Sequence, residues 1–457
     1  FLMNLVSINP ANNKILESHK EISTEKINQI INSSYNTYLE WRNESISYRS
    51  KMMSDLAELL KQKKEKLGAL MTQEMGKPIK QSIAEAEKCA WVCEYYADNA
   101  ERFLSKKEIS TDSKKSFISF QPIGLILAIM PWNFPFWQVF RFASPTLMAG
   151  NVGILKHASN VQGCAKQIEK LFLEAGFPEY AFSNLVIGSN KVSNVINNPL
   201  VRAITLTGSA PAGKSVASHA GSLLKKTVLE LGGNDPYIIL EDADLNNAVE
   251  SCIAGRMLNT GQSCIAAKRF IVVKARLDEF IDKVEQKINN MKMGDPLDSN
   301  IDIGPMVNTD SRDELHQQVL KSIEKGAKLI SGGKIPESDG SFYPPTLLTN
   351  VEPGMSAFDD ELFGPVAVII SAKDQAHAID LANKTNYGLG AAIFTADLDK
   401  GEKIAINELE AGSCFVNDFV KSDPRLPFGG IKESGYGREL SEFGILEFVN
   451  IKSVVIQ

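Results

Sequence analysis

The sequence predicts an α/β protein built around two sheets in which strands alternate with helices. Short apolar runs at residues 152–155, 202–206 and 269–273 are separated by stretches of helical length. This is the pattern of parallel sheets covered by helices on both faces. The alternation starts again after residues 232–233, so a second sheet is expected there. Open sheets of this kind bind ligands beyond the carboxyl ends of their strands.

The first hundred residues are expected to be helical. Ile27 and Ile31, and later Leu56 and Leu60, recur at the spacing of an amphipathic helix. A third helix is expected over about residues 81–103. This region is therefore assigned to the faces of the first sheet.

Strand-like segments follow the helices and also end the chain. Residues 116–120 and 123–130 are apolar and β-prone, and so is the tail at 451–456. A lone terminal strand exposes an unpaired edge and usually pairs with another strand. We therefore expect the segment around 103–121 and the tail to form one small sheet that builds an oligomer.

Composition excludes several classes of protein. The 457 residues are 44% hydrophobic and 23% charged, which is ordinary for a globular chain and unlike a disordered one. A net charge of −6 disfavours nucleic acid and anionic membranes as partners. The six cysteines form no C-x-x-C pair, and no apolar run reaches membrane-spanning length. We expect a cytoplasmic protein with reduced thiols and no metal site.

One string matches a phosphate-binding motif. Residues 208–215, Gly-Ser-Ala-Pro-Ala-Gly-Lys-Ser, fit the pattern G-x-x-x-x-G-K-[ST] and follow a predicted strand. A helix start of this kind favours a phosphate group. Pro211 removes one amide donor, which does not suit a nucleotide cradle. The pyrophosphate of a dinucleotide would use the same helix end, so a P-loop NTPase is kept only as a remote alternative.

Two strings carry residues suited to acyl chemistry. Cys264 follows Gly-Gln-Ser, a turn that could expose the sulfur as a nucleophile, and Glu230 opens Glu-Leu-Gly-Gly-Asn, where its carboxylate could act as a base. Asn133 stands in Pro-Trp-Asn-Phe-Pro, and its amide can stabilise an oxyanion. The alternatives are a buried structural cysteine and a packed, proline-rich turn.

Two further strings complete the set. In Glu361-Leu-Phe363-Gly-Pro, the phenyl ring could pack on a flat ligand ring and the carboxylate could accept from sugar hydroxyls. The alternative is an ordinary loop that enters a strand. The run at 427–435 is a glycine-rich loop whose simplest explanation is backbone crowding.

Taken together, these five strings resemble the aldehyde dehydrogenase family, in order and spacing, from Pro131 to Glu439. The phosphate-binding string coincides with the family's Thr-Gly-Ser turn. The resemblance implies a Rossmann-type NAD(P)-binding domain at 1–103 and 123–231 and an α/β catalytic domain at 232–430. It also implies a small β oligomerisation element at 104–122 and 431–457, and hence a homodimer or homotetramer.

The resemblance also assigns roles. Cys264 would attack the aldehyde carbon, Asn133 would hold the resulting oxyanion, and Glu230 would activate water to hydrolyse the thioester. The expected cofactor contacts are Trp132, Lys156, Ser159, Gly208, Ser209, Leu231, Glu361 and Phe363.

The cofactor preference depends on the end of Lys156-His-Ala-Ser159. Members of the family that prefer NAD often carry Glu at the last position, where it repels a 2′-phosphate. Ser159 does not repel it, and Lys156 could pair with it. We therefore expect NADP to be used, alongside NAD.

A substrate carboxylate is the expected specificity element. Gln138 and Arg141 fall on the helix after Asn133 that would line the substrate tunnel, and succinate-semialdehyde dehydrogenases resemble this chain in having that arginine. A guanidinium captures a carboxylate with two parallel hydrogen bonds. Ser422 and Arg425 are expected to complete the anion pocket.

Alternatives and departures accompany this assignment. Another semialdehyde or an uncharged aldehyde is the alternative substrate, and Arg141 could instead be a surface residue paired with an acid. Leu258 stands where one subgroup has a second arginine, and Ala266 where some members have a second cysteine.

Overall fold

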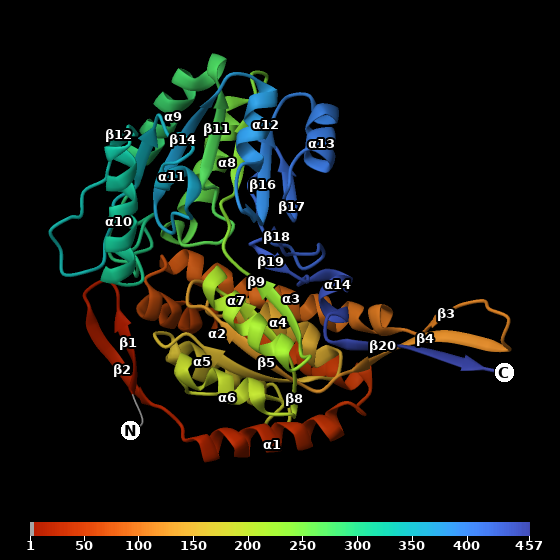
Figure 1. The fold of residues 1–457 in the computed structure, drawn as a ribbon. Coiled ribbons are helices and arrows are strands. Elements are labelled where there is room, and N and C mark those ends of the chain that lie inside the picture. The colour runs from red at the N-terminus through yellow and green to blue at the C-terminus, as the bar shows by residue number, and fades with distance from the viewer. Residues whose placement is uncertain (1–3) are drawn as a thin grey trace.

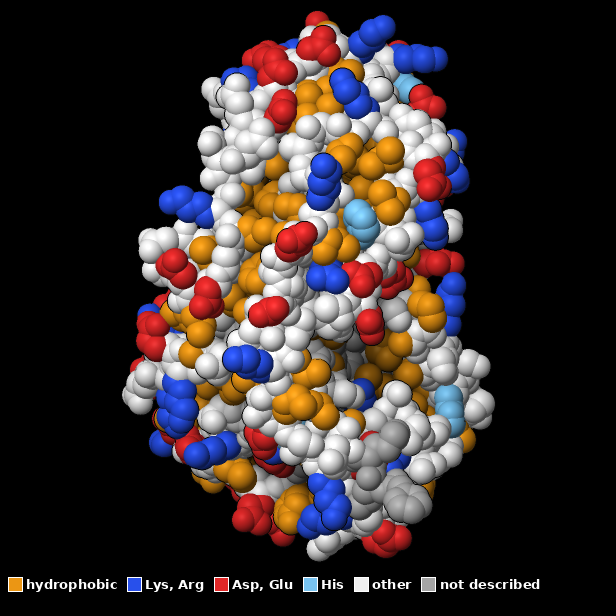
Figure 2. Space-filling model, turned by 90° about the vertical axis from the view of Figure 1, so that its left-hand side faces the viewer, with side chains coloured by type: hydrophobic (Ala, Val, Ile, Leu, Met, Phe, Trp, Pro, Cys, Tyr) orange, Lys and Arg blue, Asp and Glu red, His pale blue; other side chains and the backbone are white. Residues whose placement is uncertain are grey.

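The chain forms two sheet-centred lobes, one above the other in Figure 1, and a narrow arm that leaves the lower lobe. The computed structural model describes residues 4–457. No helix in this range is long and apolar enough to span a membrane. On the face shown in Figure 2, acidic and basic side chains are interspersed rather than gathered into a patch of one sign.

The lower, six-stranded lobe has the strand order β19-β9-β8-β5-β6-β7. Its strands are β5 (Leu125–Met130), β6 (Val152–His157), β7 (Phe182–Asn184), β8 (Val201–Thr207), β9 (Lys226–Glu230) and β19 (Gly435–Tyr436). All neighbours are parallel except β19, which runs antiparallel to β9. Parallel strands buried on both faces read as continuous apolar runs, which is why the sequence revealed them.

Helices cover both faces of this sheet. They are α1 (Thr24–Trp41), α2 (Ile46–Met75), α3 (Ile79–Leu104), α4 (Trp137–Met148), α5 (Gln162–Glu174), α6 (Val192–Asn197), α7 (Ala210–Ser222) and α14 (Ser441–Leu446), with a 3₁₀ turn at Ser189–Lys191. The three long N-terminal helices confirm the helical spacing. Ser23 and Ser45 cap α1 and α2, each accepting a backbone N–H of the first turn.

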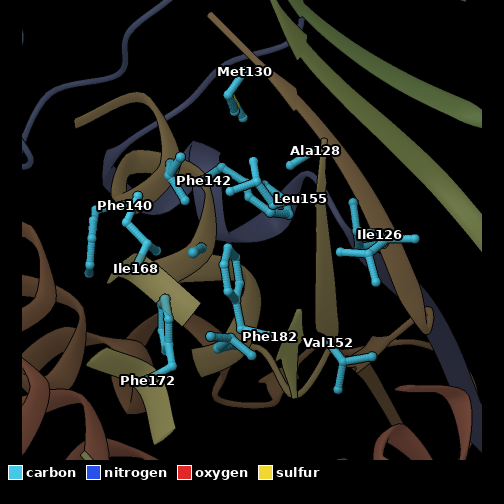
Figure 3. Close-up of a cluster of buried hydrophobic side chains, with 14 of the residues drawn as sticks. Ile126, Ala128, Met130, Phe140, Phe142, Val152, Leu155, Ile168, Phe172 and Phe182 are labelled. Carbon is cyan, nitrogen blue, oxygen red and sulfur yellow. The ribbon is translucent and has the colours of Figure 1, made fainter. Parts of the chain in front are cut away.

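A close-packed aromatic cluster fixes α4 against this sheet (Figure 3). Phe140 of α4 stacks on Phe172 of α5 at 5.6 Å between ring centroids, and Phe172 stacks on Phe182 at 4.5 Å. Every residue of α4 is buried. Close-packed interiors leave little room for displacement, so polar side chains carried by α4 have defined positions.

The upper, seven-stranded lobe has the strand order β12-β13-β14-β11-β10-β16-β17. Its strands are β10 (Pro236–Ile239), β11 (Arg269–Val273), β12 (Lys328–Ser331), β13 (Thr346–Thr349), β14 (Val366–Ala372), β16 (Gly390–Phe394) and β17 (Ser413–Val416). Only β12, at the edge, runs antiparallel to its neighbour. The predicted second sheet after residue 233 is thus confirmed.

This lobe carries a second set of helices. They are α8 (Leu245–Met257), α9 (Leu277–Asn289), α10 (Thr309–Glu324), α11 (Ser356–Asp359), α12 (Gln375–Asn383) and α13 (Leu398–Asn407), with 3₁₀ turns at Leu258–Gly261 and Lys274–Arg276. A two-stranded ladder of β15 (Tyr387–Gly388) and β18 (Ile431–Lys432) lies where the lobes meet.

The arm consists of β3 (Lys107–Glu108), β4 (Lys115–Pro122) and β20 (Val449–Ile456) in the order β20-β4-β3. The tail therefore pairs with the 104–122 segment, along the full length of β4. The expected element also includes residues 431–448, and in the structure β18 and β19 join the ladders of the lobes while α14 packs on α3 and α4.

The start of the chain differs from its expected helical structure. β1 (Asn4–Asn9) and β2 (Lys14–Lys20) form an antiparallel hairpin. Ser7 is fully buried and donates from Oγ to Glu74 Oε1 of α2 at 2.6 Å. The hairpin is held by docking on α2, a tertiary contact that these short polar strands do not reveal by periodicity. Residues 1–3 lie outside the described range.

Candidate active site

Cys264 lies on a sharply bent loop between α8 and β11. Asn259 and Thr260 both have left-handed backbone angles, φ 54° and 56°, and Gly261 follows at φ 73°. A Cβ at Gly261 would lie 2.2 Å from the carbonyl oxygen of Gly364, so only glycine fits. The bend presents the partly exposed Cys264 side chain to two cavities, one on each side.

The amide of Asn133 lies beside this loop. Asn133 Nδ2 donates to Gln262 O at 3.1 Å, and Asn259 Nδ2 donates to Asn133 O at 2.7 Å and to Gln262 O at 3.1 Å. One N–H of Asn133 is used in this way, which leaves a second donor for another acceptor. Asn259 thus fastens the loop that carries the sulfur to the loop that carries the amide, an arrangement suited to oxyanion binding.

Lys268 fixes the same loop from behind. Its buried ammonium donates to Ser263 O at 2.8 Å and Cys264 O at 2.7 Å, and it pairs with Glu361 Oε1 at 3.0 Å. Burial raises the pKa of the Cys264 thiol to about 12, and the charges of Arg141 and Lys268 oppose that rise. The thiol is therefore protonated at neutral pH and needs a base to release its proton.

Glu230 ends β9 and is buried without a hydrogen-bond partner among residues 4–457. Gly429 leaves the space that its carboxylate occupies, since a Cβ there would lie 2.7 Å from Oε1. Burial, and then the negative charge of Glu439, raise the pKa of Glu230 well above its ordinary value. Its carboxylate faces this acid rather than lining either cavity around Cys264.

The first cavity, about 170 Å³ in volume, has mostly aromatic and aliphatic walls. Phe134, Trp137, Leu258, Ile265, Phe419 and Phe428 contribute those walls. Gln138 and Arg141 of α4 and Ser422 also line it, so the structure brings three of the four expected substrate residues together. Apolar pockets with a few convergent polar groups are typical of small-molecule sites.

Arg141 is a buried residue of this cavity, not a surface one. Only 1% of its side chain is exposed, and its guanidinium lies 4.5 Å from the centre of the Phe428 ring. It forms an ion pair with Glu439, which is itself buried. The alternative that Arg141 pairs with an acid is therefore observed, and the alternative that Arg141 lies on the surface is wrong.

Arg425 does not reach the cavity. It is exposed and forms a two-pronged pair with Asp423, with Nε 2.9 Å from Oδ1 and Nη2 2.6 Å from Oδ2, over the ring of Trp91. The adjacent carboxylate captures this guanidinium locally. The expectation that Arg425 completes the anion pocket is not supported by this position.

The second cavity, about 290 Å³, lies on the other side of Cys264 between the lobes. It is lined by Trp132, Gly208, Ser209, Leu231, Glu361 and Phe363, all of them expected cofactor contacts. The rings of Trp132 and Phe363 meet edge to face at 5.8 Å. Ser209 caps the start of α7 at the edge of this cavity.

Lys156 adds a cation at the carboxyl end of β6. It is 9% exposed, burial lowers its pKa, and no carboxylate within residues 4–457 pairs with it. Lys156 is not among the residues that line the second cavity, but a buried ammonium without a carboxylate partner is suited to a phosphate group. Ser159 is exposed just past this strand and does not line the cavity.

Sequence comparison decides the family. The pattern of the aldehyde dehydrogenase family matches residues 3–454. The chain belongs to the aldehyde dehydrogenase family. The predicted fold class and family are therefore confirmed.

Relatives are similar over the full length of the chain. A probable NADP(+) succinate-semialdehyde dehydrogenase of Synechocystis is 48% identical, covering 99% of this chain and 100% of the relative. A succinate semialdehyde dehydrogenase of Escherichia coli, described as NAD(P)+-dependent, is 44% identical, covering 98% and 97%. The structure of succinic semialdehyde dehydrogenase from Streptococcus pyogenes with NADP+ superposes with a TM-score of 0.97 at 36% identity, covering 99% of each chain.

The phosphate-binding string has a different explanation in this family member. Gly213 allows α7 to approach Leu231, because a Cβ there would lie 2.6 Å from a Leu231 methyl group. Lys214 is exposed and pairs with Glu433 at 3.0 Å. A nucleotide-binding lysine would have to point at the phosphates, so the P-loop alternative finds no support.

Several residues of the site were not identified from sequence. They are Lys88, Asn259, Lys268 and Glu439. Asn259 lies five residues before Cys264, and Glu439 ends the region that resembles the family, but no local sequence pattern indicates which group either side chain would contact. Lys88 belongs to a helix far from every motif, and only the packing of α3 on α4 brings it to the cavity.

Proposed function

We propose that this chain oxidises succinate semialdehyde to succinate, with NADP+ as the preferred acceptor and NAD+ as a second one. The observation that carries the proposal is a mostly apolar cavity that opens on a cysteine sulfur and is also lined by cationic side chains, among them the buried guanidinium of Arg141. A substrate with an aldehyde at one end and a carboxylate at the other suits that arrangement. The names of the relatives support the same substrate and cofactor.

The proposed chemistry begins at Cys264. Its thiol first gives its proton to the ionised carboxylate of Glu230, which passes the proton to solvent. The sulfur then attacks the aldehyde carbon, while the free N–H of Asn133 and the backbone N–H of Cys264 donate to the developing oxyanion. NADP+, when bound, would supply the acceptor for the hydride of this carbon. A thioester on the sulfur remains, and water attacks it to release the acid and restore the thiol.

Glu230 is the proposed base for that water, and in this role its side chain turns from Glu439 toward the cavity at Cys264. A carboxylate whose pKa is raised by burial is, once ionised, a stronger base than an exposed one. Its neighbour Glu439 also has a raised pKa, caused by burial and opposed by Arg141. Two adjacent buried acids do not both ionise readily, so Glu439, which pairs with Arg141, keeps its charge, and Glu230 holds a proton that it must release before it acts as the base.

The cofactor is assigned to the six-stranded lobe. Ser209 at the start of α7 and the ammonium of Lys156 would hold its phosphates, and Trp132 and Phe363, which line the second cavity, would contact its flat ring. Loss of the acidic side chain at the position of Ser159 supports NADP+ over NAD+. The seven-stranded lobe, residues 232–430, supplies Cys264.

The arm is assigned to assembly as a homodimer or homotetramer. β20 leaves Ile451, Val455 and Ile456 exposed by 60%, 59% and 46% on a sheet that projects from the lobes. Exposed apolar side chains on an edge strand favour pairing with another chain. The free cysteines are consistent with a cytoplasmic enzyme.

Steady-state kinetics with succinate semialdehyde and uncharged butyraldehyde, each with NADP+ and NAD+, test the proposal. Cys264→Ala should abolish NADPH formation with both aldehydes. Arg141→Gln should raise KM for succinate semialdehyde far more than for butyraldehyde, and Arg141→Gln/Glu439→Gln avoids leaving a lone buried acid. Arg425→Gln is the matched control and should change neither KM. Equal effects of Arg141→Gln on both aldehydes would exclude Arg141 from binding the carboxylate, and a wild-type enzyme without preference for succinate semialdehyde over butyraldehyde would remove the substrate assignment.

A further inference from the structure

The charges around the substrate cavity are not evenly compensated. Arg141 pairs with Glu439, and Lys421 pairs with Asp418 at 2.6 Å. Glu85 also lines the cavity, but its carboxylate pairs with Lys77, as described below. Each of these charges has a partner of opposite sign within the protein.

Lys88 is the exception. It lies on α3 and lines the cavity, and its ammonium donates to Ser422 Oγ at 2.8 Å. The same nitrogen lies 4.4 Å from the centre of the Trp137 ring, which favours a cation over its face. No carboxylate of residues 4–457 lies within ion-pair distance of it.

We propose that Lys88, acting with Ser422, binds the carboxylate of the substrate and so selects aldehydes that carry an acid at their far end. This inference rests on the proposed function and deepens it. Arg141 faces the same cavity, but its charge is already neutralised by Glu439, so Lys88 supplies the net positive charge that attracts an anion. An ammonium has three donors, and Ser422 accepts one.

The surroundings of Lys88 leave it ready for an incoming anion. Burial first, and then the charge of Arg141 on α4, lower the pKa of Lys88 to about 8. Glu85 and Cys89 on α3 and Asp423 oppose that shift. Glu85 is held by Lys77, and Asp423 by Arg425, so neither neutralises the ammonium. A bound substrate carboxylate would neutralise the ammonium, and it would raise the pKa of Lys88 again.

Within residues 4–457, no other cation takes this role from the opposite wall. Leu258 lines the cavity there, and the nearby Arg256 is buried with its Nη2 donating to Leu362 O at 2.8 Å and Gly261 O at 3.2 Å. Arg425 lies outside, as described above. Among the described residues that line the cavity, Lys88 on α3 of the six-stranded lobe is the cation without a carboxylate partner.

The test compares kcat/KM for succinate semialdehyde with kcat/KM for butyraldehyde in Lys88→Met, Lys88→Arg and wild type. The ratio of the two values cancels any effect on the thiol, the cofactor or folding that both substrates share. Lys88→Met should lower the ratio by about 10-fold to 100-fold, the range for losing a charge-assisted hydrogen bond. Lys88→Arg should restore part of it. Lys80→Met, an exposed lysine of the same helix, is the control and should leave the ratio unchanged.

The pH dependence of the same ratio separates a charge effect from a change of shape. In wild type the ratio should fall as the pH rises through about 8, because Lys88 loses its charge, and in Lys88→Met it should be flat. A ratio within about twofold of wild type in Lys88→Met, or a pH dependence that persists in it, overturns the assignment of Lys88. A wild-type enzyme without preference for the charged aldehyde would instead refute the proposed function. Loss of preference in Arg141→Gln but not in Lys88→Met would refute this inference alone.

Discussion

A buried ion pair holds the start of α4, the helix that carries Gln138 and Arg141. The side chains of Lys77 and Glu85 are 0% and 2% exposed and pair with each other. Glu85 Oε1 also accepts the backbone N–H groups of Phe136 and Trp137, both at 2.9 Å. A helix leaves its first amides without intrahelical partners, so this carboxylate serves as a tertiary cap.

Glu85→Ala should be strongly destabilising. It leaves the ammonium of Lys77 buried without a counter-charge, and removing one partner of a buried pair costs about 3–5 kcal/mol. Two buried amides also lose their acceptor, at about 1–3 kcal/mol each when unsatisfied. We therefore expect a loss of at least about 4 kcal/mol in the free energy of unfolding, since these contributions are not additive.

The double variant Lys77→Met/Glu85→Gln should recover most of that loss. The glutamine oxygen can still accept from the two amides, and no charge is left buried, so we expect it within about 2 kcal/mol of wild type. The assay is urea-induced unfolding, with KM for succinate semialdehyde as a second measurement of the position of α4. The exposed pair Lys64–Glu87, between the neighbouring helices α2 and α3, is the matched control, and its loss should cost less than about 1 kcal/mol.

Two results would refute this reasoning. One is a Glu85→Ala variant no less stable than a Glu87→Ala variant. The other is a double variant as unstable as the sum of its single variants, which would mean that the buried charge is not the source of the loss.

Three further predictions concern stability and assembly. Burial holds the pKa of His157 at about 4, so between pH 6.5 and 4 only the unfolded chain takes up its proton. As the pH falls through that window, the free energy of unfolding should decrease by up to about 3 kcal/mol. In the variant His157→Gln, the free energy of unfolding from urea titrations should lack this part of its pH dependence. An unchanged pH dependence in that variant would contradict the role of His157. Asn259→Ala should cost about 2–4 kcal/mol and lower kcat, because it loses two hydrogen bonds and strains a left-handed residue. Asn259→Gly is free of that strain and should be the more stable of the two variants in the same unfolding assay. The reverse order of stability would contradict the argument from backbone strain. Ile451→Asp/Val455→Asp should reduce the molar mass measured by light scattering, and an unchanged mass would exclude the arm from assembly.

Much of the architecture was predictable because its signals are local. Buried parallel strands such as β6 are continuous apolar runs, and α1 and α2 show a helical period, so each appears within a short window of sequence. The strings around Asn133, Glu230 and Cys264 were recognisable for the same reason. The β1–β2 hairpin was not, since what stabilises it is contact with α2 rather than its own pattern.

The sequence by itself determined the two α/β sheets, the family and the residues suited to thiol chemistry, because periodicity and turn chemistry are properties of neighbouring residues. Only the tertiary structure decided how the charges pair. Arg425 forms an ion pair with the adjacent Asp423, and Arg141 forms one with Glu439, which is distant in sequence. The packing of α3 on α4 brings Lys88 to the cavity. An ion pair forms between side chains that the packing of the chain brings within a few ångströms of each other. The separation of two residues along the sequence does not predict that distance.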